Sequence, residues 1–216
     1  MAVSALNDLE IKTIDEYRTT HQSSILTVMF TDIQGFTEIT ENRGDHYSAN
    51  LRRLHDALID SPVEQLYNGK VVKHCGDSVM AVFSDPHNAV LAALKIQKEL
   101  RKFNANKPEG ILDDVKVRVG IHVGEVGVEH IQGQLDIFGK VVNRASRVEA
   151  LAEGEQIYIS SNVYEKSKHL ITDFEGKNLT WTHHGKYRMR GIDDGIEIFE
   201  VSEADLAAKH RAPRMS

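Results

Sequence analysis

Two aspartates lie at the ends of apolar runs, where a carboxylate is well placed to hold a metal ion. Asp32 follows the β-rich run ILTVMFT (25–31), and Asp77 lies in the Cys-Gly-Asp turn between the runs 70–74 and 78–83. Two hard oxygen ligands without a His or Cys companion suit Mg²⁺ or Mn²⁺ better than Zn²⁺. Because acidic turn residues are commonly just solvated, the spacing alone leaves a metal site and a plain turn both open.

A third stretch, LDIFGKVVNRASRVEA (135–150), predicts a helix that carries an amide and a guanidinium on one face. Asn143 and Arg147 are four residues apart, so their side chains project in the same direction and could bind a hydroxyl and a phosphate. A different face carries an apolar stripe that would be buried, formed by Val141, Ala145, Val148 and Ala152. The alternative is a solvated polar face, which would show the same spacing.

Hydrophobic periodicity predicts the elements that must position these residues. Strands are predicted over 25–31, 70–74, 78–83, 115–123, 124–131, 156–160 and 196–201, and helices over 46–66, 86–103, 140–152 and 160–168. Residues 124–131 are expected to pair with the strand before them as a hairpin. A terminal hairpin is expected between 188–189 and 196–201, with its turn at 191–195.

The order of these elements, β-α-β-β-α-β with further strands, predicts the fold class. It favours an α+β fold with a ferredoxin-like βαββαβ core and extra C-terminal strands. In that core the first strand lies beside the hairpin 70–83, which would bring Asp32 and Asp77 to one end of the sheet. The architecture alone implies no function.

The composition is that of an ordinary globular protein and argues against several classes of function. The chain has 216 residues, 41% hydrophobic and 27% charged, so it can form one domain with a sizeable core. Its formal net charge of −6 gives no basic footprint for nucleic acid or an anionic membrane. The single cysteine, Cys75, excludes an internal disulfide and is typical of a reducing compartment. With neither a signal-like leader nor a run of about 18 apolar residues, we expect no membrane insertion and a cytoplasmic location.

Four motifs, in order, carry a resemblance to a known family: FTDIQGF, VKHCGDSVMAVF, VGIHVGEVGV and LDIFGKVVNRASR. They resemble the catalytic domain of class III nucleotidyl cyclases, the adenylyl and guanylyl cyclases. The resemblance implies an N-terminal helical segment (1–24), a class III cyclase homology domain (25–201) and a C-terminal tail (202–216). Residues 5–20 predict one polar helix, which would cap the core or, alternatively, serve in dimerisation or coupling.

The resemblance implies a metal site and a reaction. Asp32 and Asp77 match the family's metal-binding aspartates, and the backbone carbonyl of Ile33 matches a further ligand, so each site would hold two Mg²⁺ or Mn²⁺ ions. The reaction would convert ATP to 3′,5′-cyclic AMP and pyrophosphate by in-line attack of the ribose 3′-hydroxyl on the α-phosphorus. One ion would lower the pKa of that hydroxyl, and both would neutralise the triphosphate.

The implied base-reading residues are Lys73 and Asp136. A Lys donor with an Asp acceptor suits adenine, whose N1 accepts and whose N6 donates a hydrogen bond. Guanylyl cyclases carry a Glu-type acceptor at the Lys73 position, because guanine presents N–H groups there. The pair therefore argues for ATP as the substrate.

Three further residues match positions that bind the ribose and the phosphates. Asn143 would orient the ribose, and Arg147 would stabilise the charged phosphates in the transition state. Arg190 aligns with a phosphate-binding lysine of the family, although Lys186 nearby could serve instead. Glu125 stands where some members place a phosphate-binding arginine, which puts one cationic contact in doubt.

The resemblance also implies an assembly. Members of the family work as dimers in which the metal aspartates of one chain face the base-, ribose- and phosphate-binding residues of the other. This chain holds both sets, so a homodimer with two composite sites is implied.

Two alternatives to an adenylyl cyclase stay open. The first is a cyclase of GTP or of a pyrimidine triphosphate. The second is a catalytically silent, cyclase-like module that binds nucleotide or regulates a partner. Silent members usually lose one of the aspartates or the Asn/Arg pair, and all four residues are present here.

Overall fold

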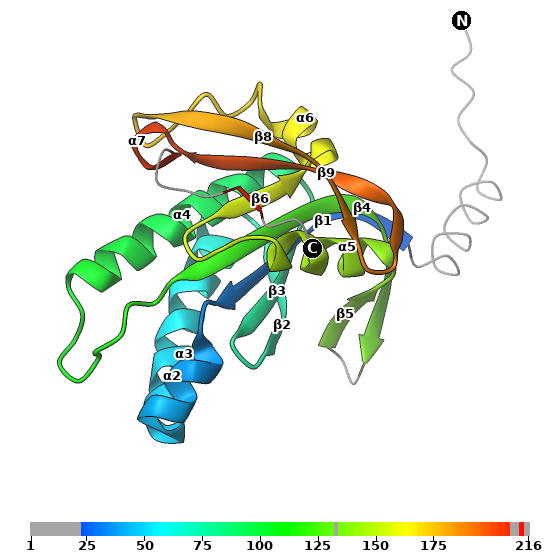
Figure 1. Cartoon of the computed structure of the whole chain (residues 1–216). Helices are drawn as coiled ribbons and strands as arrows, with labels where there is room; N and C mark the ends of the chain where they lie inside the picture. The colour runs from blue at the N-terminus through cyan, green and yellow to red at the C-terminus, as the bar shows by residue number, and fades with distance from the viewer. Residues whose placement is uncertain (1–22, 132–133, 208–211, 214–216) are drawn as a thin grey trace, which may run out of the picture.

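The structure of the chain is a computed structural model that describes residues 23–131, 134–207 and 212–213. The polar helix expected over 5–20 lies outside this range. A mixed sheet runs through the molecule in the strand order β2-β3-β1-β4-β6-β9-β8-β7, and β5 pairs with β4 (Figure 1). The strands are β1 (Ser23–Ile33), β2 (Lys70–Cys75), β3 (Ser78–Phe83), β4 (Val117–Ile131), β5 (Gln134–Phe138), β6 (Ile157–Ser160), β7 (Asp173–Phe174), β8 (Lys177–Met189) and β9 (Ile192–Glu203).

The fold-class prediction is confirmed. In the part of the sheet ordered β4-β1-β3-β2, β1 is antiparallel to both of its neighbours, as a ferredoxin-like core requires. The extra strands β6, β9, β8 and β7 continue the sheet beyond β4. The helices are α2 (Phe36–Arg43), α3 (Asp45–Asp60), α4 (Pro86–Ala105), α5 (Lys140–Ala150), α6 (Ser161–Ser167) and α7 (Ala204–Ala207). None of the helices in residues 23–131 and 134–207 is long and apolar enough to cross a lipid bilayer.

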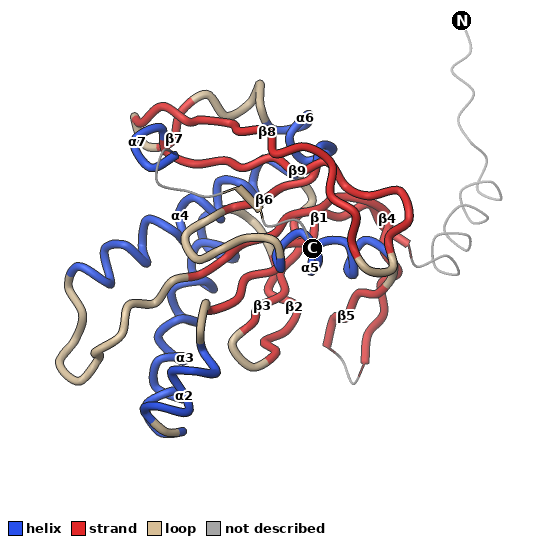
Figure 2. The backbone as a smooth tube through the Cα atoms, in the orientation of Figure 1, coloured by secondary structure: helices blue, strands red, loops and turns tan. Residues whose placement is uncertain are grey.

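The helices form layers on both faces of the sheet (Figure 2). Met29 of β1 belongs to a large cluster with α3 and α4, whereas Val28 packs with Val141 and Ala145 of α5. This division follows from the alternation of side chains along a strand. Asp32, an even number of residues after Val28, therefore lies on the α5 face of the sheet.

The hairpin predicted within 115–131 is wrong. β4 is one continuous strand over that region, and the strand that turns back to pair with its end is β5, so that the two form a two-stranded arm (Figure 1). The glycines of β4 allow close packing instead of a turn. A Cβ on Gly124 would lie 2.7 Å from Cγ2 of Val141, and one on Gly127 would lie 2.4 Å from the Phe138 ring.

Two other boundaries differ from the predictions. The helix predicted over 46–66 ends at Asp60 as an α-helix and continues as a π-helical segment, Ser61–Leu66, because Pro62 lacks the N–H that an α-helix needs. The C-terminal hairpin is longer than expected, with pairing from Leu179 and Glu203 to Met189 and Ile192. Its turn is consequently tighter and places Arg190 at the tip.

His122 of β4 is a buried titratable group in this framework. Its side chain is 5% exposed, and Nδ1 lies 2.8 Å from Oγ of Ser160. Burial, followed by the positive charge of Arg144, lowers the pKa of His122 to about 4. The folded chain therefore holds this imidazole neutral at pH values where an unfolded chain would protonate it.

Acid should destabilise the fold through His122. Because the folded pKa is depressed below the unfolded value of about 6.5, this stabilisation is fully present above pH 6.5 and is lost as the pH falls toward 4. The loss amounts to at most about 3 kcal/mol. Urea unfolding at pH 7 and pH 4.5 should show a smaller acid-induced drop for His122→Asn than for the unchanged chain. Equal drops in the two proteins would contradict the assignment.

Candidate active site

The structure brings Asp32 and Asp77 together at one end of the core sheet. Asp32 lies near the end of β1, and Asp77 lies in the β2–β3 turn, where Gly76 supplies a backbone φ of 68°. Burial, followed by the neighbouring Asp32 carboxylate, raises the pKa of Asp77. Because the Asp32 carboxylate lies close enough to disfavour the ionisation of Asp77, a divalent cation bound between the two would relieve the repulsion.

The donor set at this place fits a hard cation. In the described ranges, no three or more His, Cys, Asp or Glu side chains form a metal-binding group. A magnesium-like ion tolerates this, because it commonly keeps waters and takes oxygens from substrate phosphates. Ile33, which would offer its backbone carbonyl, has its side chain 1% exposed in the core, so the backbone beside Asp32 is well anchored.

A guanidinium that the sequence analysis did not single out contacts Asp32. Nε and Nη2 of Arg118 donate hydrogen bonds to Oδ2 of Asp32 at 3.0 and 2.5 Å, and Oγ of Ser78 donates to Oδ1 at 2.6 Å. Nε of Arg118 also lies 2.6 Å from Oε1 of Glu149 on α5. Burial, opposed by Arg118 and reinforced by the two aspartates, raises the pKa of Glu149 to about 7. The sequence signal that could have identified Arg118 is the run VRVGIH (117–122), in which Arg118 shares a strand face with a glycine and a histidine and not with valines.

The two expected base-reading residues form a direct ion pair. Nζ of Lys73 on β2 donates to both carboxylate oxygens of Asp136 on β5, at 2.7 and 2.9 Å. The hydrogen bond from Lys73 lowers the pKa of Asp136, whose Oδ1 also accepts from the backbone N–H of Ile137. The pair thus joins two separate hairpins at the surface, with the Lys73 side chain 44% exposed.

The expected ribose and phosphate residues share a hollow between α5 and the β8–β9 turn. Asn143, Ser146 and Arg147 line it from α5, and Arg190 lines it from the turn, around a cavity of about 350 Å³. Lys186 instead lines a different hollow with His122, Arg144 and Ser160. Of the two candidate cations, the structure therefore brings Arg190 together with Asn143 and Arg147.

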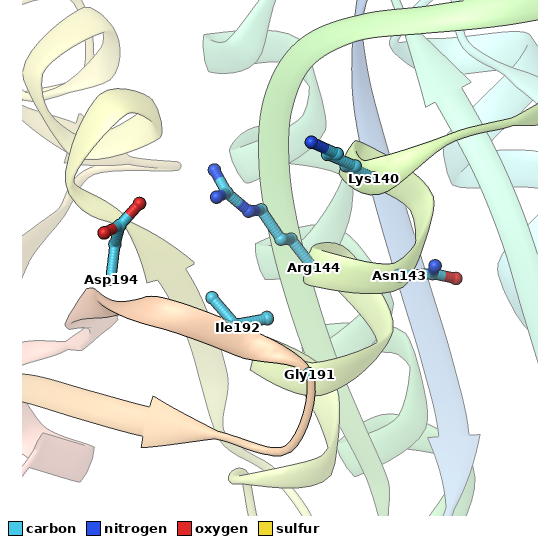
Figure 3. Close-up of a pocket in the computed structure, with 6 residues that line it drawn as sticks. All are labelled: Lys140, Asn143, Arg144, Gly191, Ile192 and Asp194. Carbon is cyan, nitrogen blue, oxygen red and sulfur yellow. The ribbon is translucent and has the colours of Figure 1, made fainter.

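A neighbouring hollow continues along the same turn. It is lined by α5 and the start of β9, and Figure 3 shows Arg144 and Asn143 projecting from different sides of the helix. Asp194 projects from β9 on the same side as Arg144 (Figure 3). Both hollows thus lie between α5 and the β8–β9 hairpin, and Asn143 is among the residues that line each of them.

The residues expected to bind metal and those expected to bind the ribose and phosphates lie on different sides of α5. Asp32, 13% exposed, and Arg118 lie between the sheet and the buried face of the helix, which carries Glu149. Asn143 and Arg147 are exposed on the opposite side of the helix. One described chain therefore presents the two sets in different directions.

Comparisons with known proteins agree on the family. The family model described as the adenylate and guanylate cyclase catalytic domain matches residues 19–203. "Serine/threonine-protein kinase pkn2" of Myxococcus xanthus is 36% identical in a 146-residue alignment that covers 59% of this chain and 17% of that protein. "Putative adenylate cyclase 3" of Rhizobium meliloti is 27% identical over 183 residues, 85% of this chain and 29% of that protein. The chain thus spans less than a third of the length of either relative.

The fold comparison agrees with the sequence comparison. The crystal structure of the adenylyl cyclase CyaB from P. aeruginosa superposes with a TM-score of 0.73 and 26% identity, over 85% of this chain and 96% of that one. The four sequence motifs, the ferredoxin-like core and these matches all point to one assignment. The chain belongs to the adenylate and guanylate cyclase catalytic domain family, the class III nucleotidyl cyclases.

Proposed function

We propose that this domain is an adenylyl cyclase, which converts ATP to 3′,5′-cyclic AMP and pyrophosphate. The observation that carries the proposal is the Lys73–Asp136 pair, in which a cationic donor and an anionic acceptor lie 2.7 Å apart on neighbouring hairpins. An ammonium can donate to N1 of adenine, and a carboxylate can accept from its N6 amino group. Guanine offers an N–H at the first of these positions, so it would leave the ammonium without an acceptor there.

The chain's own residues divide the remaining tasks between them. Asn143 orients the ribose, while Arg147 and Arg190 stabilise the charge on the phosphates, and Asp32 and Asp77 with the Ile33 carbonyl form the metal site. Mg²⁺ or Mn²⁺ bound there, two ions per site, would lower the pKa of the 3′-hydroxyl and neutralise the triphosphate. The 3′-oxygen forms a bond to the α-phosphorus as the bond to the bridging oxygen breaks, pyrophosphate leaves, and the proton passes to water. Positioning and charge stabilisation supply the catalysis.

We further propose that the active unit is a homodimer with two composite sites. The placement of Asp32 and of Asn143 with Arg147 on different sides of α5 supports this arrangement. A second copy of the chain, related by a two-fold axis, would supply the set that the first copy directs elsewhere. Each site would then take its metal ligands from one protomer and its base, ribose and phosphate ligands from its partner.

We place the domain in the cytoplasm. The single cysteine of the sequence, Cys75, is exposed and carries a free thiol. An exposed free thiol without a partner is typical of proteins that work in a reducing compartment.

Incubation with ATP, GTP, CTP and UTP, each with Mn²⁺ or Mg²⁺, tests the proposal through the cyclic product and pyrophosphate. We expect ATP to be the preferred substrate, and the double variant Lys73→Glu/Asp136→Cys to shift preference toward GTP. A polar group that the bound base covers and leaves without a partner costs roughly 1–3 kcal/mol, so the ATP-to-GTP ratio should fall about 5- to 150-fold.

Lys70→Glu is the matched control for this experiment, because it makes the same charge change on β2 at a lysine that pairs with Glu64. It should keep the parent's ATP-to-GTP ratio. An unchanged ratio in the double variant would place base reading elsewhere. If the parent prefers another triphosphate, that nucleotide replaces ATP as the proposed substrate. If none of the four triphosphates gives a cyclic product, the domain is a catalytically silent module.

A further inference from the structure

We propose that the hollow lined by His122, Arg144, Ser160 and Lys186 binds a small phosphate-bearing anion, which holds the β8–β9 hairpin against α5. The hollow has a volume of about 240 Å³, below the roughly 300–1,000 Å³ of pockets that take drug-sized ligands. We therefore expect a ligand smaller than a nucleotide. Binding of the anion is independent of the proposed function, whereas its consequence for ATP rests on that function.

Two of the buried residues that line the hollow are polar. His122 is 5% exposed and Ser160 is 1% exposed, and the parallel pairing of β4 with β6, which aligns Ile121 with Ile159, sets them side by side. Oγ of Ser160 lies 2.8 Å from Nδ1 of His122 and does not cap α6, although a serine at that position commonly caps its helix. The buried end of the hollow is thus polar, which suits a ligand that forms hydrogen bonds.

Two cations line the hollow from different elements. Arg144 projects from α5 (Figure 3), and Lys186 lies on β8. After burial, the positive charge of Arg144 is the second cause of the lowered pKa of His122, so the charge of the guanidinium acts on the buried end of the hollow. Among the side chains that the structure describes, neither Arg144 nor Lys186 forms an ion pair. Both charges are therefore available to an anion.

The β8–β9 hairpin fixes the place of Lys186. A Cβ on Gly195 would lie 3.3 Å from Cε and 3.4 Å from Cγ of Lys186, so the stem of the lysine lies over this glycine. Glu197 is the cross-strand partner of Lys186 and also lines the hollow, but it is exposed, so water screens its charge. Arg144 and Lys186 against Glu197 leave one net positive charge around the hollow.

The donors around the hollow suit a tetrahedral oxyanion. Besides the guanidinium of α5 and the ammonium of β8, the side chains of Ser161 and Asn162 line it from α6. A carboxylate accepts hydrogen bonds close to its own plane, whereas the oxygens of a phosphate point in several directions. A guanidinium also binds phosphate through two parallel hydrogen bonds. Donors on three different elements therefore favour a phosphate over a carboxylate.

A phosphate in this hollow would connect the two elements that form the neighbouring ribose and phosphate hollow. Arg144 is adjacent to Asn143 on α5, and Lys186 lies four residues before Arg190 in the β8–β9 hairpin. An anion held by both Arg144 and Lys186 would therefore restrain Arg190 relative to Asn143. The concentration of the anion would then control how firmly the hairpin is held.

Calorimetric titration of the full chain with inorganic phosphate, without divalent metal and at an ionic strength fixed with chloride, tests the site. We expect saturable binding that depends on Arg144. Arg144→Met should raise the Kd about 10- to 100-fold, because it removes hydrogen bonds to a charged group. Arg144→Lys should give an intermediate Kd, because it keeps the charge without the fork, and Lys186→Met should also raise the Kd.

Two further variants make the test specific. Arg147→Met is the matched control, because Arg147 lies on the same helix but lines the neighbouring hollow, and it should leave the Kd unchanged. Glu197→Gln removes an exposed like charge and should lower the Kd about 2- to 5-fold. Phosphate binding that is lost in Arg147→Met and kept in Arg144→Met would place the anion elsewhere and overturn the inference. A folded parent without saturable binding would also overturn it.

Two other ligands distinguish the sources of the phosphate group. If pyrophosphate binds more tightly than glycerol 3-phosphate, the natural ligand is the product of the proposed reaction. If glycerol 3-phosphate binds more tightly, the natural ligand is a phosphorylated metabolite. Either result supports the site only if Arg144→Met weakens the binding of that ligand, and an unchanged Kd in Arg144→Met contradicts the site.

Amide hydrogen exchange tests the restraint on the hairpin without an assay of activity. Saturating phosphate should slow exchange over residues 186–197 in the parent and should leave the exchange of Arg144→Met unchanged. If phosphate binds to the parent but exchange in the hairpin stays the same, the anion does not hold the hairpin and that part of the inference is wrong.

The KM for ATP separates failure of this inference from failure of the proposed function. With phosphate at a saturating concentration, the parent should have a lower KM than Arg144→Met, and the two values should agree without phosphate. If phosphate binds as expected but the chain makes no cyclic nucleotide, the proposed function alone is wrong. If the chain cyclises ATP while folded Arg144→Met binds phosphate as the parent does, the inference alone is wrong.

Discussion

Asp32→Ala and Asp77→Ala should each abolish nucleotide cyclisation while the chain stays folded. The two carboxylates are the anionic side chains proposed for the metal site, and metal ions supply several kcal/mol of transition-state charge stabilisation. Losing about 4 kcal/mol lowers the rate about 1,000-fold, so the residual turnover of each variant should be at most about one thousandth of the parent's. Formation of cyclic AMP and pyrophosphate, measured with Mn²⁺ and with Mg²⁺, gives the comparison.

The stability of these variants distinguishes a lost ligand from a lost fold. Burial and, after it, the neighbouring Asp32 carboxylate raise the pKa of Asp77, so its ionised form destabilises the metal-free chain and Asp77→Ala removes that destabilisation. Urea unfolding should therefore find Asp77→Ala at least as stable as the parent at pH 7. Asp113→Asn, an exposed carboxylate paired with Arg43, should keep full activity. Activity of the parent should vanish with EDTA and return with added metal. Normal activity in Asp32→Ala or Asp77→Ala would contradict the proposed metal site.

Mixing Asp32→Ala with Arg147→Ala should restore activity that neither variant has alone. In the proposed homodimer, Asp32 of one protomer and Arg147 of its partner serve the same site, so each variant is nearly inactive at both of its sites. In a mixed dimer, one site contains both substitutions and the other site contains neither. With equal amounts and free exchange, half of the dimers are mixed and each has one good site, which predicts roughly a quarter of the parent activity.

The complementation experiment needs proof of exchange. A tag on one variant allows mixed dimers to be isolated and counted before the assay. Asp32→Ala mixed with Asp77→Ala is the negative control, because both variants damage the metal set and every dimer keeps a metal defect in each site. Tagged mixed dimers without recovered activity would mean that each site is built within one chain.

Local sequence patterns were sufficient to predict the core of the fold. The β-rich run ILTVMFT predicted the strand before Asp32, which the structure extends to Ile33, and turn chemistry around Gly76 predicted the β2–β3 hairpin. The i, i+4 spacing on α5 predicted that Asn143 and Arg147 share an exposed face. These features depend on neighbours a few residues away, which a sequence displays directly.

Long-range packing explains what local patterns missed. The glycines in β4 resemble turn residues in the sequence, yet Gly124 and Gly127 make room for Val141 and Phe138 in a continuous strand. The contact between Arg118 and Glu149 depends on strand register and on the approach of α5. Neither determinant can be read from the residues that flank Arg118 or Glu149.

If Lys73 and Asp136 read the base as proposed, their pairing would make base recognition an exchange of partners. Both groups are already satisfied in the free chain, so an arriving adenine must break one bidentate contact before it can form its own hydrogen bonds. Under the proposed function, adenine replaces the broken contact with its own hydrogen bonds, so the net free energy of the exchange is close to zero. A base with the wrong donor and acceptor pattern breaks the ion pair without forming hydrogen bonds that replace it. The site would therefore select its nucleotide by binding the wrong base less well and not by binding adenine more tightly. Since salt weakens an exposed ion pair, the penalty for the wrong base should shrink as ionic strength rises.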